Sequence, residues 1–329
     1  MIFEYMQDGT LNFLEAFAAR TGSEITHNQI AISGSPGKGT IIMADMEAGL
    51  KMAIFHLTLQ EDLVFRGNVS QSRPDVLSIR LQVSTAASHH IPFKLQLNEY
   101  AQPDTLIQLA SNDIASDIRF AAGSTIFATL ILVQRDLLKS LLGTNDHALV
   151  KHIICNKGPH FYNEAMTQEI QCVLALIFKT NDNELFGNLY YRIKATELIY
   201  QLFYNLAKRM DTPCISIRKD DLSKVHEVKD HILSDLSIVP ELHALATMTG
   251  MSESKLKRIF KQVFGNSIYN YYQTARMNEA AYLIRKNNLS ISEVGYRLGF
   301  SNLSHFSRLF DKHIGIKPKK YSLLKGEKV

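Results

Sequence analysis

A motif that occurs twice near the end of the chain constrains the fold more than any other feature of the sequence. Its two copies read Leu245-Ala246-x-x-x-Gly250-Met-Ser252 and Val294-Gly295-x-x-x-Gly299-Phe-Ser301. They continue as Leu256-x-Arg258-x-Phe260 before Gly265, and as Phe306-x-Arg308-x-Phe310 before Gly315. The offset between the copies is 49 residues in the first half of the motif and 50 in the second half. The repeat therefore predicts two equivalent structural units, with one additional residue near the turn of the second.

The small residues of the motif suit two helices that cross at a tight turn. Ala246 and Gly295 stand where the helices would approach closely, so a small side chain is needed there. Gly250 and Gly299 end the first helix, where a positive φ is expected and glycine adopts it without Cβ strain. The next helix can be capped by Ser252 in the first copy, and by Ser301 or Asn302 in the second. We therefore predict helix-turn-helix units at about 243–265 and 291–315.

The second helix of each unit carries polar side chains opposite its apolar stripe. One such face alone could be an ordinary solvated surface, but its presence in both copies favours contact with double-stranded DNA. Arg and Lys suit guanine in the major groove, Asn suits adenine, and Ser or His can take either role. The predicted DNA-binding residues are Ser254, Lys255, Lys257, Arg258, Lys261, Asn302, Ser304, His305, Arg308 and Lys312.

The segment between the two units is predicted to be one long helix. It begins after Ser267, carries apolar residues at helical spacing, and ends at Asn287-Asn288. Ser290 and Glu293 then form a capping-box pattern that starts the next helix. A rigid connection would fix the distance between two reading helices, so that both could enter adjacent major-groove segments about one turn (~34 Å) apart.

Charge is distributed unevenly along the chain. Residues 215–329 hold 19 Lys and Arg against 11 Asp and Glu, a balance of +8. Residues 1–214 hold 17 against 21, a balance of −4. This asymmetry indicates that only the C-terminal part meets a polyanion.

The segment from about Lys229 to Lys325 resembles the DNA-binding domain of the AraC/XylS family of bacterial regulators. Beyond the repeat itself, the resemblance rests on Arg276-x-x-x-Ala280-x-x-Leu283-Ile284, on Val294-Gly295-Tyr-Arg-Leu-Gly299-Phe300 and on Gly-Ile-Lys-Pro318-x-x-Tyr321. It implies a sequence-specific transcription regulator, more commonly an activator, that also meets RNA polymerase. It further implies base contacts by Ser254, Lys257 and Arg258 in the first unit and, with less strict reading, by Ser304, His305 and Arg308 in the second.

The first part of the chain is rich in strand patterns. Apolar and polar residues alternate at 77–83 and again at 93–97, and 124–133 is almost wholly apolar and β-branched. The segment 50–64 reads as one long strand or a hairpin. Short strands separated by Gly and Pro turns are typical of a sandwich or a small barrel. We therefore predict a β-rich domain over 1–145. Family members commonly carry a cupin-like sensor here, which implies a pocket for a small-molecule effector.

Helical patterns return after the strands. They cover 136–142, 163–179 and 184–210, the last two within a helical region predicted over 146–211. The last two helices could pack on the sheet or form the seam of a homodimer. A linker is expected at 212–224, followed by the DNA-binding domain over 225–329. The predicted fold class is α+β in two domains, β-rich and cupin-like first and all-α second.

Three other kinds of protein fit the sequence less well. A metal-dependent cupin enzyme would need a His-x-His pair on a strand, whereas His89 and His90 are adjacent and would point to opposite faces. A fused DNA-repair methyltransferase would need clustered cysteines, whereas Cys155, Cys172 and Cys214 lie far apart. A structural nucleoid protein would be uniformly basic. We therefore expect no catalytic residue, no metal ligand and no cofactor.

The sequence also bears on location. The spacing of the three cysteines does not suit a disulfide framework, which favours a reducing cytoplasm. No segment approaches the ~18 continuous apolar residues of a membrane span. The start of the chain lacks the pattern of a secretory signal and reads instead as a short amphipathic helix that stops at Gly22.

Overall fold

The computed structural model describes residues 1–70, 75–85, 106–143, 147–156, 159–164, 166–179, 186–209, 217, 219–286 and 289–323. The described chain divides into two compact units. The first, here called the N-terminal domain, holds the described residues up to Lys219, and the second, the C-terminal domain, holds those from Asp220 onward.

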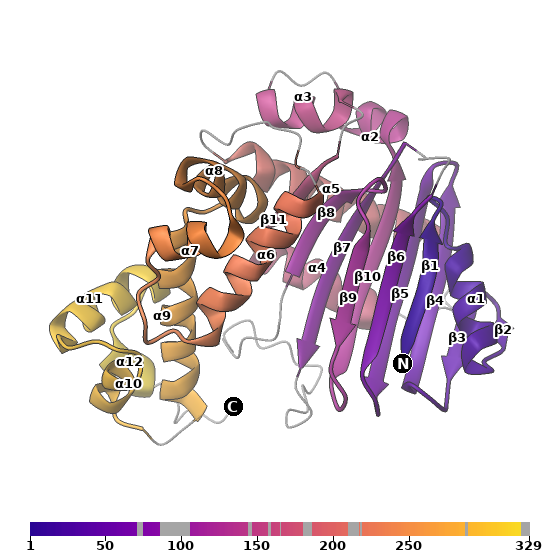
Figure 1. Ribbon diagram of the computed structural model, residues 1–329. Helices are drawn as coiled ribbons and strands as arrows, with labels where there is room; N and C mark the ends of the chain where they lie inside the picture. Colours follow the sequence, from indigo (N-terminus) through magenta and orange to yellow (C-terminus); the bar gives the residue numbers. More distant parts are fainter. Residues whose placement is uncertain are drawn as a thin grey trace. The chain divides into compact units, whose positions relative to one another are not determined.

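The N-terminal domain is built on an eight-stranded antiparallel sheet (Figure 1). Its strands, in spatial order, are β11 (Phe161–Glu164), β8 (Leu106–Ser111), β7 (Val76–Thr85), β10 (Thr125–Gln134), β5 (Leu50–Leu59), β4 (Gly37–Glu47), β3 (Gln29–Ile32) and β2 (Ile25–Thr26). Among the described strands, β11 and β2 each have a single neighbour, so the sheet is open at both ends.

A second, three-stranded sheet packs on one face of the large sheet. It consists of β1 (Ile2–Gln7), β6 (Leu63–Val69) and β9 (Ser116–Phe120), with β1 parallel to β6 and β9 antiparallel to it. Helix α1 (Asn12–Thr21) joins this side. The layers share an apolar core that includes Phe3, Phe17, Leu57, Leu63 and Phe65. This part of the domain is therefore a two-sheet sandwich.

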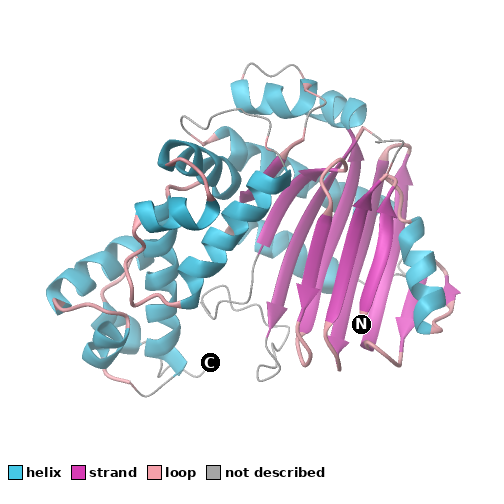
Figure 2. Ribbon diagram, in the orientation of Figure 1, coloured by secondary structure: helices cyan, strands magenta, loops and turns pink. Residues whose placement is uncertain are grey.

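Helices cover the opposite face of the large sheet (Figure 2). These are α4 (Gln168–Lys179) and α5 (Gly187–Ala207), while α2 (Arg135–Leu142) and α3 (Ala148–Cys155) lie at one end of the strands. Alternate residues of β7, namely Leu77, Ile79 and Leu81, are buried with Leu198 and Leu202 of α5 in a second apolar core. Successive residues of β7 therefore face different layers, because side chains alternate between the two faces of a strand.

Several predicted elements of the N-terminal domain are confirmed. The alternation at 77–83 lies in β7, the apolar run at 124–133 lies in β10, and the predicted helices at 136–142 and 184–210 correspond to α2 and α5. Helix α1 ends at Gly22, which takes the left-handed conformation with φ of 65°. The strand predicted at 93–97 lies outside the described residues, and the cupin-like character of the domain stays a prediction.

Two predicted boundaries in this domain are wrong. The segment 50–64 is neither one strand nor a hairpin, because β5 pairs with β4 and β10 while β6 starts the other sheet at Leu63. The helix predicted from Asn163 begins only at Gln168, because Asn163 and Glu164 pair with Gln108 and Ile107 as the end of β11. Both errors concern pairing with distant segments, which local periodicity does not encode.

The C-terminal domain is all-α. Its helices are α6 (Lys219–Ser234), α7 (Leu242–Thr249), α8 (Glu253–Phe264), α9 (Ile268–Lys286), α10 (Ile291–Arg297), α11 (Leu303–Ile314) and α12 (Pro318–Leu323). The linker predicted over 212–224 is wrong in its last part, since α6 already begins at Lys219. Leu222, Val225 and Ile232 of α6 are buried at helical spacing, and that burial stabilises the helix. None of the helices in the described part of the chain combines the length and hydropathy that a membrane span requires.

Candidate nucleic-acid interface

The first helix-turn-helix unit consists of α7 and α8. Helix α7 ends at Gly250, whose φ is 62° and whose backbone N–H donates to the carbonyls of Ala246 and Thr247. Ser252 caps α8 by accepting a hydrogen bond from the Lys255 backbone N–H at 3.3 Å. The positive φ at Gly250 and the serine cap are both confirmed.

The second unit consists of α10 and α11. Ser290 and Glu293 form the complete capping box at the start of α10, with each side chain accepting from the other residue's backbone N–H. Gly299 has φ of 78°. Asn302, rather than Ser301, caps α11 by accepting from the His305 backbone N–H at 3.0 Å.

The turn of the second unit is closely packed. A Cβ added to Gly299 would lie 2.2 Å from the backbone oxygen of Ser237. A Cβ added to Gly295 would lie 2.7 Å from Leu303 Cδ2, where α10 meets α11. The equivalent of Gly295 in the first unit is Ala246, which is buried. The structure thus agrees with the predicted need for small residues where the helices cross.

Helix α9 connects the two units and belongs to the core of each. At its first end, Tyr271 packs edge-on against Phe260 of α8, with ring centroids 5.5 Å apart. At its second end, Met277 and Ala281 are buried in one cluster with Phe306 of α11. The predicted long helix is therefore confirmed, and it holds both units on one continuous element.

Most of the predicted DNA-contacting side chains lie on the outer faces of α8 and α11. In α8, Ser254, Lys257 and Arg258 are exposed and Lys261 is partly exposed. In α11 the exposed members are Ser304, His305, Arg308 and Lys312. Within each helix these positions follow a spacing of three or four residues, so they share one surface opposite the buried stripe.

Two of the predicted residues have structural partners within the domain. Lys255 donates from Nζ to Asp221 Oδ1 of α6 at 2.7 Å. Asn302 uses its side-chain oxygen for the cap of α11. Lys255 therefore ties α8 to α6, a connection that the sequence did not indicate.

The part of the chain that holds both units matches a known family of domains. Residues 245–323 fit a sequence family described as a helix-turn-helix domain. The multiple antibiotic resistance protein MarA of Escherichia coli is 28% identical over 115 residues, which cover 34% of this chain and 91% of MarA. The C-terminal domain belongs to the AraC/XylS family.

Two further comparisons concern the same AraC-type domain. The HTH-type transcriptional regulator YfiF of Bacillus subtilis is 36% identical over 104 residues, or 31% of this chain, and the match spans a third (33%) of the length of YfiF. A solved structure of an AraC-type transcriptional regulator from Chromobacterium violaceum is 26% identical, with 34% of this chain and 100% of that chain covered and a TM-score of 0.31. Each of these likenesses covers only about a third of this chain.

Among the described residues of the AraC-type domain, Arg276 is a buried cation, and the sequence indicated it only as part of the family pattern. Arg276 of α9 is 3% exposed, and its guanidinium donates to the backbone oxygen of Leu298, with Nε at 2.8 Å. The guanidinium also lies 3.6 Å from the ring centroid of Phe300. Burial lowers the pKa of Arg276. Arg276 thus fixes the end of α10 to α9 and positions the second unit.

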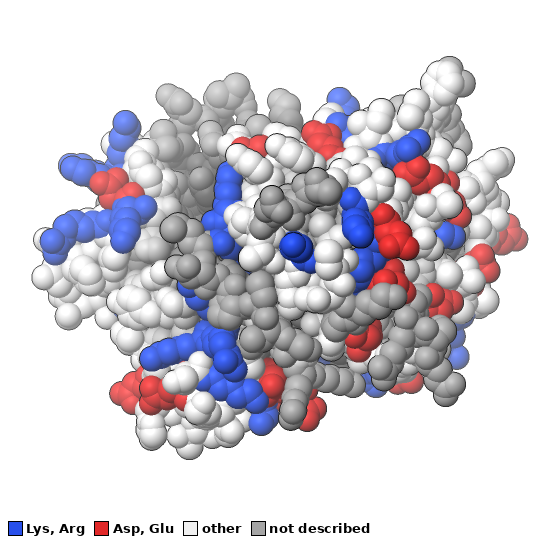
Figure 3. Space-filling model, turned by 90° about the horizontal axis from the view of Figure 1, so that it is seen from above, with Lys and Arg blue, Asp and Glu red and all other residues white. Residues whose placement is uncertain are grey.

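The surface charge of the AraC-type domain agrees with its excess of basic residues. Figure 3 shows Lys and Arg side chains gathered in several places on this face of the molecule, with acidic side chains among them. Within the described residues, no group of three or more His, Cys, Asp or Glu side chains could hold a metal ion. The exposed side chains of α8 and α11 offer hydrogen-bonding groups and positive charge.

Proposed function

We propose that this chain regulates transcription by binding a specific DNA operator through both helix-turn-helix units at once. The observation that carries the proposal is the pair of exposed polar faces on α8 and α11, joined by the single helix α9. With 19 residues, α9 spans about 28 Å. That length is close to the ~34 Å of one DNA turn, which suits two recognition helices in adjacent major-groove segments.

The two kinds of contact come from different side chains. Ser254, Lys257 and Arg258 occupy the first turns of α8, where a recognition helix meets base edges. Lys319 and Lys320 are exposed on α12, which packs against α11 through Tyr321 and Phe310, and they suit phosphate contacts. The domain would thus combine base reading with neutralisation of the DNA backbone.

Binding to mapped genomic sites tests this proposal. A duplex that holds both half-sites should bind the full chain at least ~100-fold more tightly than a duplex with one half-site replaced, because the second contact becomes intramolecular. Fluorescence anisotropy would measure both affinities. Equal affinities would contradict joint binding by the two units.

Salt dependence provides a separate test of the phosphate contacts. If six or more phosphates are neutralised, affinity should fall by about 10³ or more between 50 and 200 mM salt. A flat response would show that the exposed cations of this surface do not contact the DNA backbone.

We also propose that the N-terminal domain is the sensor of the regulator, with a cupin-like role in binding a small-molecule effector. Support comes from its two-sheet sandwich, its separate apolar cores and its negative charge balance, none of which suits DNA contact. In this proposal the regulator works in the cytoplasm, responds to the effector and acts on RNA polymerase as an activator.

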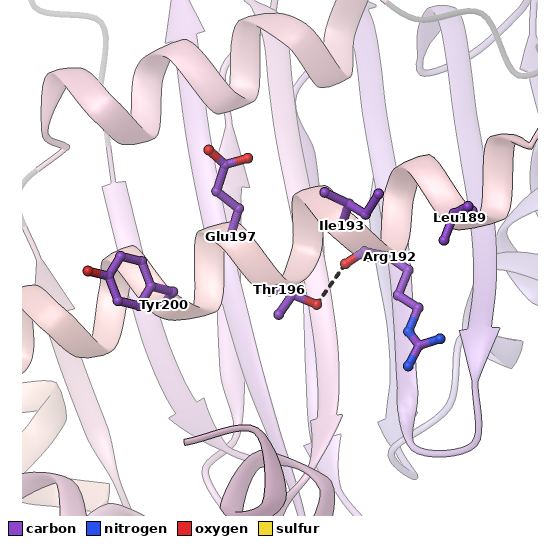
Figure 4. A pocket seen from close by; sticks show the side chains of 6 residues that line it. All are labelled: Leu189, Arg192, Ile193, Thr196, Glu197 and Tyr200. Carbon is purple, nitrogen blue, oxygen red and sulfur yellow. Dashed lines mark hydrogen bonds between the residues drawn. The ribbon is translucent and has the colours of Figure 1, made fainter. Parts of the chain in front are cut away.

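A homodimer is the assembly that α5 suits best. Its inner face is buried against the sheet, but Leu189, Ile193, Tyr200 and Tyr204 are about half exposed along its outer face. Figure 4 shows Leu189, Ile193 and Tyr200 along the hollow that Arg192, Thr196 and Glu197 also line. Apolar residues at this spacing are typical of a helix that pairs with another helix.

The positions of these residues are suited to antiparallel pairing with a second copy of α5. An antiparallel pair centred between Thr196 and Glu197 places Leu189 opposite Tyr204 and Ile193 opposite Tyr200. The same surface then serves both copies, as a two-fold dimer requires.

The dimer can be tested with two matched substitutions in the full chain. Ile193 and Ile2 are both 55% exposed, on α5 and β1 respectively. Ile193→Asp should give a monomer in sedimentation velocity, while Ile2→Asp should leave the dimer intact. A wild-type monomer at micromolar concentration would contradict the proposed assembly.

A further inference from the structure

One strand of the large sheet carries polar residues on the face that looks toward the small sheet. In β7, the alternation that sends Ile79 and Leu81 to the helices sends Ser78, Arg80 and Gln82 to the opposite side. A charged residue at such a position is unusual, because the space between two packed sheets is normally apolar.

The strand register shows where the interior changes from apolar to polar. The row that crosses the sheet at Arg80 runs through Met43 of β4, Ala53 of β5, Leu130 of β10, Arg80 of β7, Gln108 of β8 and Asn163 of β11. Its first three members pack in the apolar core of the sandwich. From Arg80 onward every member is polar, and the Gln108 side chain donates to Asn163 Oδ1 at 3.5 Å.

Arg80 is buried there without a matching acid. Its Nε and Nη1 atoms are shielded from solvent and have no hydrogen-bond partner among the described residues, although part of the side chain remains accessible. No described Asp or Glu forms an ion pair with it. Burial lowers the pKa of Arg80 to about 10, so the side chain is still cationic at neutral pH.

A tyrosine lies within electrostatic reach of Arg80 on the small sheet. Tyr5 of β1 interacts electrostatically with Arg80, and its hydroxyl is hydrogen-bonded to Ser116 of β9. Ser116 in turn accepts from Gln7 Nε2 at 2.9 Å. The face opposite Arg80 therefore offers neutral hydrogen-bonding groups and no described carboxylate.

An unpaired guanidinium in such a place is costly. Water can satisfy its hydrogen bonds but does not neutralise its charge, and a buried charge is normally paired. We propose that Arg80 binds the carboxylate of a small acidic ligand between the two sheets, with Tyr5 and Gln108 beside it. This proposal rests on the proposed function in one respect only, namely that the ligand would be the effector of the regulator.

The surroundings favour a monocarboxylate with an apolar body. Arg80 provides one fork of donors, which matches the two oxygens of a carboxylate. Its neighbour in the row, Leu130, and the nearby Ala128 of β10 are apolar, so the rest of the ligand would contact hydrocarbon. A phosphate would bring more charge than the described residues here can neutralise.

The test uses the full chain and thermal unfolding with defined probes. Octanoate and benzoate are compared with octanamide, benzamide and inorganic phosphate. At saturating concentration the carboxylates should raise the Tm of the wild-type N-terminal domain by about 5 °C, and the amides and phosphate should not. A rise with phosphate alone, or no rise with any carboxylate, would overturn the proposal.

Substitution of Arg80 separates a binding role from a structural one. Arg80→Met should abolish the carboxylate shift and raise the Tm of the unliganded domain by about 2–4 °C, because an unpaired buried charge is replaced by an apolar chain of similar length. Arg80→Lys should keep part of the shift. Arg66→Met is the matched control, since Arg66 lies on the outer face of β6 and pairs with Glu4 at 3.0 Å. It should keep the full carboxylate shift.

A lower Tm of unliganded Arg80→Met would show that Arg80 stabilises the fold and would overturn the proposal. Operator binding, measured on the same samples, distinguishes this site from the proposed function. A wild-type chain that binds mapped operators but shows no carboxylate shift would refute only the acidic ligand. Failure of the wild-type chain to bind mapped operators would refute only the proposed regulator.

Discussion

The first helix-turn-helix unit and the second follow one plan but hold their turns differently. In the first unit, a Cβ placed on Gly250 would have no described heavy atom within 4 Å apart from those of Gly250 and its chain neighbours, whereas in the second the Cβ of Gly299 would collide with the backbone of Ser237. The crossing point is Ala246 in the first unit and must be Gly295 in the second. The second turn thus depends on close packing with its surroundings, while the first depends mainly on its own backbone geometry.

On their exposed faces, by contrast, it is the first unit that presents more cationic side chains. Helix α8 presents Lys257, Arg258 and Lys261, while α11 presents Arg308 and Lys312 and uses Asn302 for its cap. Arg276 adds a buried connection that the structure gives to the second unit. The difference suggests that the first unit contributes more to contact with DNA and the second more to fixed placement.

The largest predicted effect concerns the two turn glycines. Gly299→Ala should destabilise the second unit by about 3–5 kcal/mol, because it adds a backbone collision to the cost of a left-handed alanine. Gly250→Ala should cost only about 1–2 kcal/mol. Hydrogen exchange of the amides in α10–α11 and α7–α8 would measure both. Equal losses would show that the two turns are held in the same way.

Arg276→Met should have the next largest effect. It leaves the Leu298 carbonyl without its charged donor and removes the cation over Phe300, which should cost about 2–3 kcal/mol. Hydrogen exchange should accelerate in α10 and remain unchanged in α7. Faster exchange in both units would contradict a role confined to the second.

Base reading can be compared with one arginine from each recognition helix. Arg258→Ala should weaken specific operator binding by about 1–3 kcal/mol. Arg308→Ala should cost less, because the second helix is expected to read DNA less strictly. Anisotropy titrations at physiological salt would give both values, and a larger loss for Arg308 would reverse the assignment.

The helix caps provide a smaller test of the same comparison. Ser290→Ala and Ser252→Ala should each cost about 1 kcal/mol. The loss should be greater for Ser290, because its side chain is also hydrogen-bonded to the Glu293 carboxyl, whereas alanine keeps the backbone N–H that donates to Glu293. Similar losses in urea unfolding followed at each unit would show that this additional side-chain hydrogen bond contributes little.

The same capping box predicts a weak pH dependence. Hydrogen bonds from the side chain and backbone of Ser290 hold the pKa of Glu293 below its ordinary value of 4.5. Its contribution to α10 is therefore present at neutral pH and is lost as the pH falls through the folded-state pKa. NMR titration of the Glu293 carboxyl would check the direction, and a pKa at or above 4.5 would contradict it.

Local chemistry explains which elements the sequence predicts well. The turn glycines, the cap at Ser252 and the capping box at Ser290 depend on neighbouring residues, so each is readable from the sequence. The spacing of Leu222, Val225 and Ile232 also indicates the helix α6. The charged residues at 219–221, which precede this apolar pattern, are instead typical of a linker.

Features that depend on distant segments could not be read in this way. Strand β1 pairs in parallel with β6, some 60 residues later, and nothing local marks that partner. The family pattern contains Arg276 but does not indicate its role. Its hydrogen bonds to the Leu298 carbonyl form only when α9 and α10 pack together. Arg80 reads as an ordinary polar position of an alternating strand until a second sheet covers it.

The single helix α9 has a consequence for how this domain would select among genomic sequences. A helix without a hinge cannot adjust its length, so both half-sites would be tested at one separation and one rotational phase. Two correct half-sites with five additional base pairs between them would face opposite sides of the duplex. For such a protein, the spacer between the half-sites would be free in composition but fixed in length. The number of base pairs in the spacer would then select targets as strictly as the sequences of the half-sites do.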